Sequence, residues 1–135
     1  MNSIKQILKS GNIYSKIKSL KPEVIFIHAG LEDIRNDSCS NEEIIDNYKQ
    51  LIYNLLECSD NVKICVSLII PTPGYPQLNN RINEVNDAIT HFITWLRSDR
   101  GLKNNIYSSN NVHLSSYIAR RTGSHGTELF LTERG

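Results

Sequence analysis

Two carboxylates stand directly behind an apolar run near the start of the chain. Residues 24–29 read VIFIHA, Gly30 ends the run, and Glu32 and Asp33 follow. A plain turn explains this pattern, with Asp33 as a cap. The carboxyl-terminal lip of a parallel sheet, where α/β enzymes keep their chemistry, explains it equally well. On that lip Glu32, Asp33 and Asp37 would offer oxygen ligands suited to Mg²⁺, although loop carboxylates are usually only solvated.

Four histidines could supply a base or a ligand contact. We expect His28 to be packed and hydrogen-bonded beneath the candidate site, His91 to face solvent from a helix flank, and His125 to lie in a polar, glycine-containing loop. His113, in the stretch NNVHLS, follows Asn110 by three residues.

Apolar periodicity predicts the elements that position these residues. Over residues 3–20 it predicts one helix broken at Gly11, or two short helices, and it predicts further helices over 40–57 and 82–96. Ser40 and Glu43 form a capping box at the start of the second of these. Continuous β-branched runs predict buried strands at 24–29, 62–70 and 104–109. The last residues, LFLTERG, look like the approach to an element that does not arrive.

The alternation of helix and strand implies right-handed crossovers. The predicted fold is therefore a single α/β domain over residues 1–135, a three-layer α/β/α sandwich with a small parallel sheet and helices on both faces. Its ligand cleft should lie at the carboxyl ends of the first two strands, lined by His28, Pro71, Thr72 and Tyr75. Asn86 interrupts an apolar stripe, and because a buried amide needs partners, we expect it to tie down a neighbouring loop.

The composition excludes several classes of protein. The formal net charge is +1 without a basic stripe, so there is no electrostatic support for a nucleic-acid or membrane partner. No run reaches membrane-spanning length and no signal peptide opens the chain. The three cysteines lack metal-ligand spacing, which favours reduced thiols in a cytoplasmic protein with no metal and no cofactor.

The stretch VIFIHAGLEDIRND resembles the third sequence block of the SGNH (GDSL-type) esterase and lipase superfamily, a buried strand followed by Gly-x-Asn-Asp. VSLIIPTP and RINEVNDAI resemble the next strand and helix, so the resemblance spans residues 20–110. It implies ester hydrolysis by a serine nucleophile, a histidine base oriented by an aspartate, and oxyanion donors that include the block's Gly and Asn. Gly30 matches the block's Gly and Asp33 its final Asp. Glu32 stands where the Asn belongs, and an ionised carboxylate cannot donate to an oxyanion.

The remaining catalytic blocks depart further from the family. No Gly-Asp-Ser block and no strand precede residues 24–29, and the serines in that part of the chain lie on the helical segment 3–20 and are poor nucleophile candidates: Ser3, Ser10, Ser15 and Ser19. His113 with Asn110 is one home for the family's Asp-x-x-His block, but an asparagine would not stabilise an imidazolium. We favour the alternative, in which that block and the family's final helix would follow Gly135.

The sequence thus predicts an SGNH-hydrolase-like domain that lacks its first strand and is catalytically inactive, either a gene fragment or a decayed copy, and SGNH-like modules do occur in animal mobile elements. Its ligand, if it has one, would be a small ester-like molecule. Two alternatives stay open: a non-catalytic binding or scaffold module, and the divalent-cation protein introduced above. Because the missing strand would leave residues 24–29 as an uncovered apolar edge, we expect marginal stability or aggregation.

Overall fold

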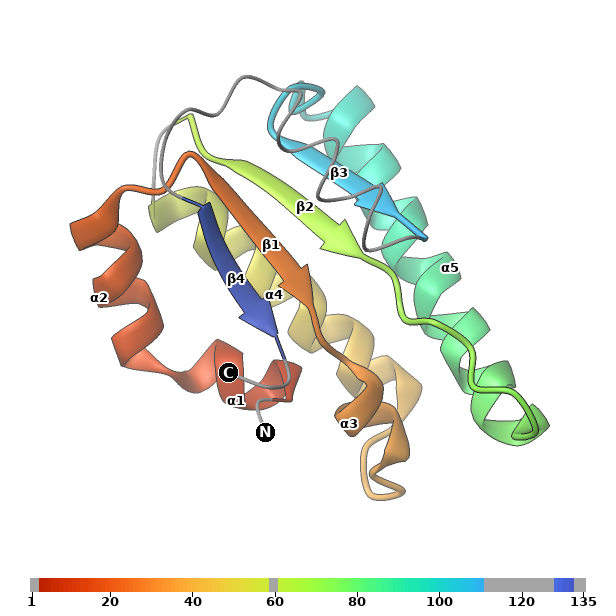
Figure 1. Cartoon of the computed structure of the whole chain (residues 1–135). Coiled ribbons are helices and arrows are strands. Elements are labelled where there is room, and N and C mark those ends of the chain that lie inside the picture. The colour runs from red at the N-terminus through yellow and green to blue at the C-terminus, as the bar shows by residue number, and fades with distance from the viewer. Residues whose placement is uncertain (1–2, 59–60, 111–127, 133–135) are drawn as a thin grey trace.

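Four parallel strands form one sheet in the order β3-β2-β1-β4 (Figure 1). The computed structural model describes residues 3–58, 61–110 and 128–132. The strands are β1 (Val24–His28), β2 (Lys63–Ser67), β3 (Ile106–Ser109) and β4 (Glu128–Thr132). The predicted α/β class and parallel sheet are confirmed. The second strand, Lys63–Ser67, is shorter than the predicted 62–70. Beyond it, the backbone of Ile69 bonds to the Asn86 side chain and that of Thr72 to Asn79.

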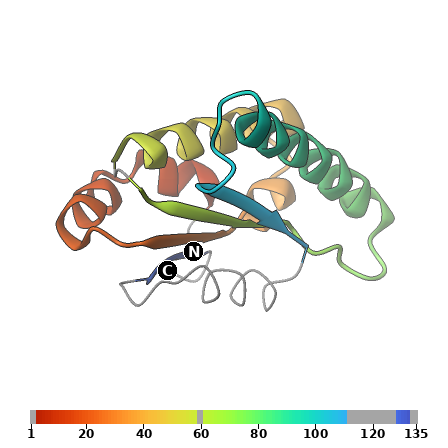
Figure 2. The same ribbon diagram turned by 90° about the horizontal axis from the view of Figure 1, so that it is seen from above.

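Five helices accompany the sheet in the described residues: α1 (Ile4–Lys9), α2 (Gly11–Leu20), α3 (Leu31–Arg35), α4 (Asn41–Cys58) and α5 (Pro76–Ser98). The break predicted near Gly11 occurs at Ser10, which separates α1 from α2. At α4, the Glu43 amide donates to Ser40 Oγ over 3.1 Å, as the capping signal predicts. The helices that the structure describes lie on one face of the sheet (Figure 2). Helices on the other face remain a prediction.

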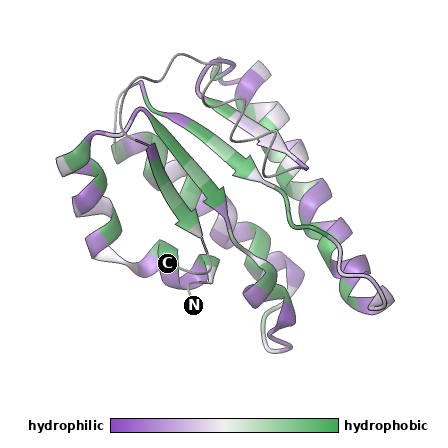
Figure 3. Ribbon diagram, viewed as in Figure 1, coloured by the Kyte–Doolittle hydropathy of each residue, from purple (hydrophilic) through white to green (hydrophobic). Residues whose placement is uncertain are grey.

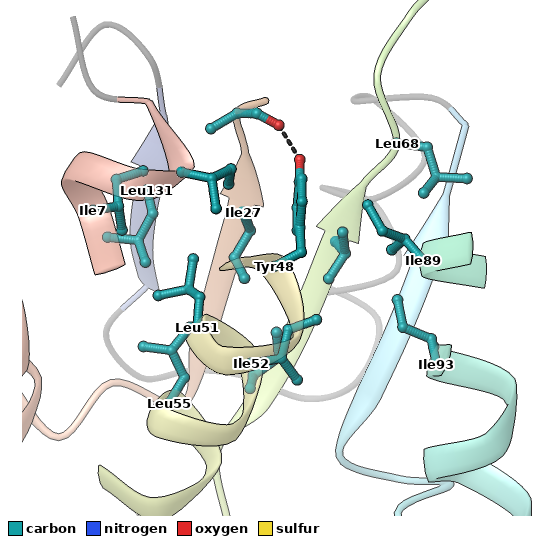
Figure 4. Close-up of a cluster of buried hydrophobic side chains, with 14 of the residues drawn as sticks. Ile7, Ile27, Tyr48, Leu51, Ile52, Leu55, Leu68, Ile89, Ile93 and Leu131 are labelled. Carbon is teal, nitrogen blue, oxygen red and sulfur yellow. Dashed lines mark hydrogen bonds between the residues drawn. The ribbon is translucent and has the colours of Figure 1, made fainter. Parts of the chain in front are cut away.

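The main core lies between this helical layer and the sheet. Ile25 and Ile27 of β1 alternate toward α4, whose buried stripe includes Tyr48, Leu51 and Ile52 (Figure 4). The apolar side of each helix turns to the strands while its polar side faces solvent (Figure 3). Full burial of each large aliphatic side chain stabilises the fold by about 1.5–3 kcal/mol before entropy is counted.

A second apolar row runs across the opposite face of the sheet. Val24, Phe26 and Cys65 are buried there with Tyr107 packed against them. The Phe26 ring stacks on Phe130 of β4, with centroids 4.7 Å apart and planes 5° from parallel. Phe130 itself is 50% exposed. Ring stacking thus joins β1 to β4 in addition to their backbone ladder.

Two expectations about β1 and the chain's last residues are wrong. Residues 128–132 are a strand, β4, rather than an approach to one. This strand pairs in parallel with β1 along its whole length, from Val24 opposite Glu128 to His28 opposite Thr132. β1 therefore has a neighbour on each side, and the uncovered edge that was the reason to expect aggregation does not exist. Local pattern could not reveal this, because parallel partners lie far apart in sequence.

Candidate functional site

A cavity among the described residues opens beyond the carboxyl ends of β1 and β2. It has a volume of about 690 Å³, within the usual range of small-molecule sites. One wall is the stretch from α3 to Asp37, and the other is the segment 72–78 with Arg81 of α5. Figure 1 shows both walls at the same end of the sheet, where the arrowheads of β1 and β2 point. We call this space the α3–α5 cavity.

The predicted cleft-lining residues divide between two cavities. Thr72 and Tyr75 line the α3–α5 cavity, and the Tyr75 side chain is 61% exposed. Pro71 does not line it. His28 instead borders a separate cavity of about 170 Å³ with Ala29, Leu31, Ile69 and Ile70.

Gly30 is required by its surroundings. Its φ of 121° is a conformation that residues with side chains rarely adopt. A Cβ at this position would lie 2.6 Å from the Tyr48 hydroxyl oxygen and 2.8 Å from Cδ1 of Ile69. The Tyr48 hydroxyl occupies this space because it donates a hydrogen bond to the Ala29 carbonyl (Figure 4). The turn from β1 into α3 is therefore built around a glycine.

Asp33 is a cap, although not of its own helix. Its side chain is 3% exposed, and its carboxylate accepts the backbone N–H of Ile4 over 2.8 Å and that of Lys5 over 3.4 Å. These are the first two amides of α1, whose N-terminal dipole favours a negative charge. Asp33 thus fixes α1 against α3, and a cap is the role that the structure shows for it.

Glu32 and Asp37 do not join Asp33 in a metal site. Glu32 borders a cavity of about 520 Å³ on the far side of α3, together with Asp33 and Glu43, whereas Asp37 lines the α3–α5 cavity. No group of three His, Cys, Asp or Glu side chains that could hold a metal ion occurs among the residues that the structure describes. Asp33 already accepts two amide hydrogen bonds. The described residues therefore offer no set of ligands for the divalent cation that the sequence suggested.

Two asparagines of α5 hold the wall formed by the segment after β2. Asn86 Oδ1 accepts the Ile69 N–H over 3.0 Å, and Asn86 Nδ2 donates to the Ile69 carbonyl over 2.8 Å. This confirms the predicted loop tie. Asn79, two turns earlier, repeats the arrangement with Thr72 at 2.7 and 2.8 Å. Each amide replaces a backbone partner for a segment that has left the sheet.

Arg81 holds the other wall. Its Nη1 and Nη2 donate to the carbonyls of Ile34 and Cys39 over 2.5 and 2.6 Å, and its Nε donates to Asn41 Oδ1 over 2.8 Å. The Ile34 carbonyl is one of the last in α3, which has no intrahelical partner to offer it. One guanidinium therefore fixes the stretch between α3 and α4 to α5. Asn79 and Asn86 are seven residues apart, and this spacing is the sequence signal that could have predicted the two asparagine contacts. No comparable signal points to Arg81.

Three serines and two cysteines of the described residues have surroundings that do not suit an activated nucleophile. Ser67 Oγ, at the end of β2, is buried without a hydrogen-bond partner, so no base contacts it. Ser3 and Ser40 are helix caps. Burial raises the pKa of the Cys39 thiol and raises that of Cys65 to about 11, which suppresses the reactive thiolate.

The structure does not test the predicted histidine block. Asn110 is exposed directly after β3. His113 and His125 lie outside the described residues. His91 is exposed on α5, as expected.

Comparison with known proteins gives a fold likeness. No protein-family model matches the sequence, and no curated protein matches it. Among solved structures the chain is similar to an acetyl esterase mutant crystallised with an acetate ion, with a TM-score of 0.58 and 18% sequence identity. The match covers 97% of this chain and 49% of the esterase chain, so the chain spans about half the length of that protein. At this identity the likeness shows a shared α/β fold.

The helices of the described residues are each too short or too polar to span a membrane.

Proposed function

We propose that the chain is a single SGNH-hydrolase-like domain that does not itself hydrolyse esters. The SGNH assignment rests on the resemblance of residues 24–37 to the family's third block, and the fold likeness to an esterase supports it. The strand, the glycine turn and the acidic helix α3 follow one another in the order that the block implies.

The proposed loss of activity rests on two residues of that block, Glu32 and Asp33. In place of the family's amide donor stands Glu32, on the first turn of α3, and a carboxylate repels a developing oxyanion. Asp33 is occupied as the cap of α1. Loss of a single oxyanion donor costs on the order of 10²–10³ in rate, and the sequence also lacks the Gly-Asp-Ser block that carries the family's nucleophile.

A hydrolysis assay tests this proposal. We expect no release of nitrophenol from short-chain nitrophenyl esters above the buffer rate, and no gain in a Glu32→Asn variant, because restoring the donor does not restore a nucleophile. Activity that is lost when one serine is replaced would overturn the proposal.

A binding module is the second candidate, because the two walls of the α3–α5 cavity are held by separate clamps. A site with fixed walls binds without the cost of ordering loops. If the chain is a self-contained module, sedimentation should show a monomer, and circular dichroism a sharp, reversible thermal transition. A gradual transition would instead favour a fragment of a longer protein.

A further inference from the structure

We propose that the α3–α5 cavity binds a small monocarboxylate with an apolar or aromatic body. This inference does not rest on the proposed loss of catalysis, since binding and hydrolysis are separate measurements. Three features of the cavity carry it: its charge, its apolar surface and its fixed walls.

The cavity carries a net positive charge. Arg35 and Arg81 line it together with one carboxylate, Asp37, which leaves a formal charge of +1. Neither guanidinium is within ion-pair range of a carboxylate in the described part of the chain, where the salt bridge found is Lys5–Glu43. Arg81 donates three N–H groups to carbonyl and amide oxygens. These partners are neutral, so the hydrogen bonds do not neutralise the positive charge of the guanidinium. A single negative charge balances this set, and a dianion would exceed it.

The apolar surface lies beside these cations. Ile34, Pro76 and Leu78 line the same cavity, and Tyr75 presents a largely exposed ring. Exposed aromatic rings beside a guanidinium form an amphipathic surface that suits a ligand with one charged end. A carboxylate at the arginines would place the ligand's body against Tyr75 and Leu78.

The walls are held before any ligand arrives. Asn79 and Asn86 fix the segment that carries Thr72 and Tyr75, and Arg81 fixes the stretch after α3. The site would therefore recognise its ligand with little rearrangement.

The test is an amide-resolved NMR titration of the whole chain with phenylacetate and, as the matched neutral probe, phenylacetamide. We expect saturable shifts in residues 72–78 and at Arg35 with phenylacetate, and binding of the amide weaker by about tenfold, the usual value of a charge-assisted hydrogen bond. Arg35→Gln should weaken phenylacetate binding by a similar factor and leave phenylacetamide unchanged. Arg100→Gln, two residues beyond the C-terminal end of α5, should change neither.

Three results would overturn the proposal: equal binding of the acid and the amide, shifts that map outside the cavity, or no saturation in the millimolar range. Arg35 is exposed, so its variant is expected to fold, and an unchanged amide spectrum away from the cavity checks this. Hydrolysis of nitrophenyl esters by a chain that also binds phenylacetate would refute the loss of catalysis and leave this inference standing.

Discussion

Among the glycines that the structure describes, Gly30 should be the one whose replacement by alanine destabilises the fold most. The backbone at φ 121° costs about 1–3 kcal/mol for a residue with a side chain. The new Cβ would also press against the Tyr48 hydroxyl and Ile69 at 2.6 and 2.8 Å, and overpacking of this kind costs about 1–3 kcal/mol. The sum, about 2–6 kcal/mol, is a large share of the 5–15 kcal/mol typical of a domain.

Gly11→Ala is the matched control. Gly11 begins α2, and a Cβ there meets nothing within 4 Å. The same chemical change should therefore be neutral or stabilise the fold by up to about 1 kcal/mol. Urea unfolding followed by circular dichroism measures both variants, and an unchanged slope with denaturant shows that the unfolded state is comparable.

A double-mutant cycle with Tyr48→Phe isolates the steric part. Removing the hydroxyl removes the closest contact, so Gly30→Ala should cost about 1 kcal/mol less in the Tyr48→Phe background. The reasoning is refuted if Gly30→Ala costs less than about 1 kcal/mol, or if it is no worse than Gly11→Ala.

Three further predictions follow from the site's contacts. Asp33→Asn should cost about 1–3 kcal/mol and raise hydrogen exchange first in residues 4–9, because α1 loses its charged cap; uniform exchange across the chain would contradict this role. Asn86→Ala should cost about 1–3 kcal/mol in urea unfolding, because it leaves the Ile69 backbone groups unpaired, while Asn83→Ala on the exposed side of α5 should stay within about 0.5 kcal/mol; equal costs would refute the clamp. Cys65, with a pKa of about 11, should have about one thiolate per thousand molecules at pH 8, so Cys58 should be alkylated first. Because the folded pKa is raised, stability should be intact below about pH 8.5 and fall as the pH approaches 11, and Cys65→Ala should flatten that slope.

The sequence predicted those elements whose pattern lies within a few neighbouring residues. The stripe of α4 and the β-branched run of β1 repeat within a few residues, so periodicity found them. Asn86 was predictable because an amide within an apolar stripe must find partners. α3 was not predicted as a helix, since its five residues are too few to show a period.

The features that sequence missed depend on residues far apart in the chain. β4 is a strand because its ladder with β1 supplies its partners, and nothing in LFLT alone says which strand will be its neighbour. Asp33 caps α1 rather than the helix it belongs to, and a capping signal is visible in sequence only when cap and helix are adjacent. Arg81 likewise joins cavity walls that lie far apart in sequence, since its carbonyl partners Ile34 and Cys39 precede it by more than forty residues.

The most direct test of the central claim is covalent labelling with a fluorophosphonate, which reacts with serines activated as nucleophiles. The purified chain would be incubated with excess reagent and its intact mass measured. The proposed loss of catalysis predicts an unchanged mass, because the sequence has no Gly-Asp-Ser block. Among the described serines, Ser67 is buried without a hydrogen-bond partner, and Ser3 and Ser40 serve as caps. Stoichiometric addition of one phosphonyl group to a single serine, abolished by unfolding the chain first, would contradict it.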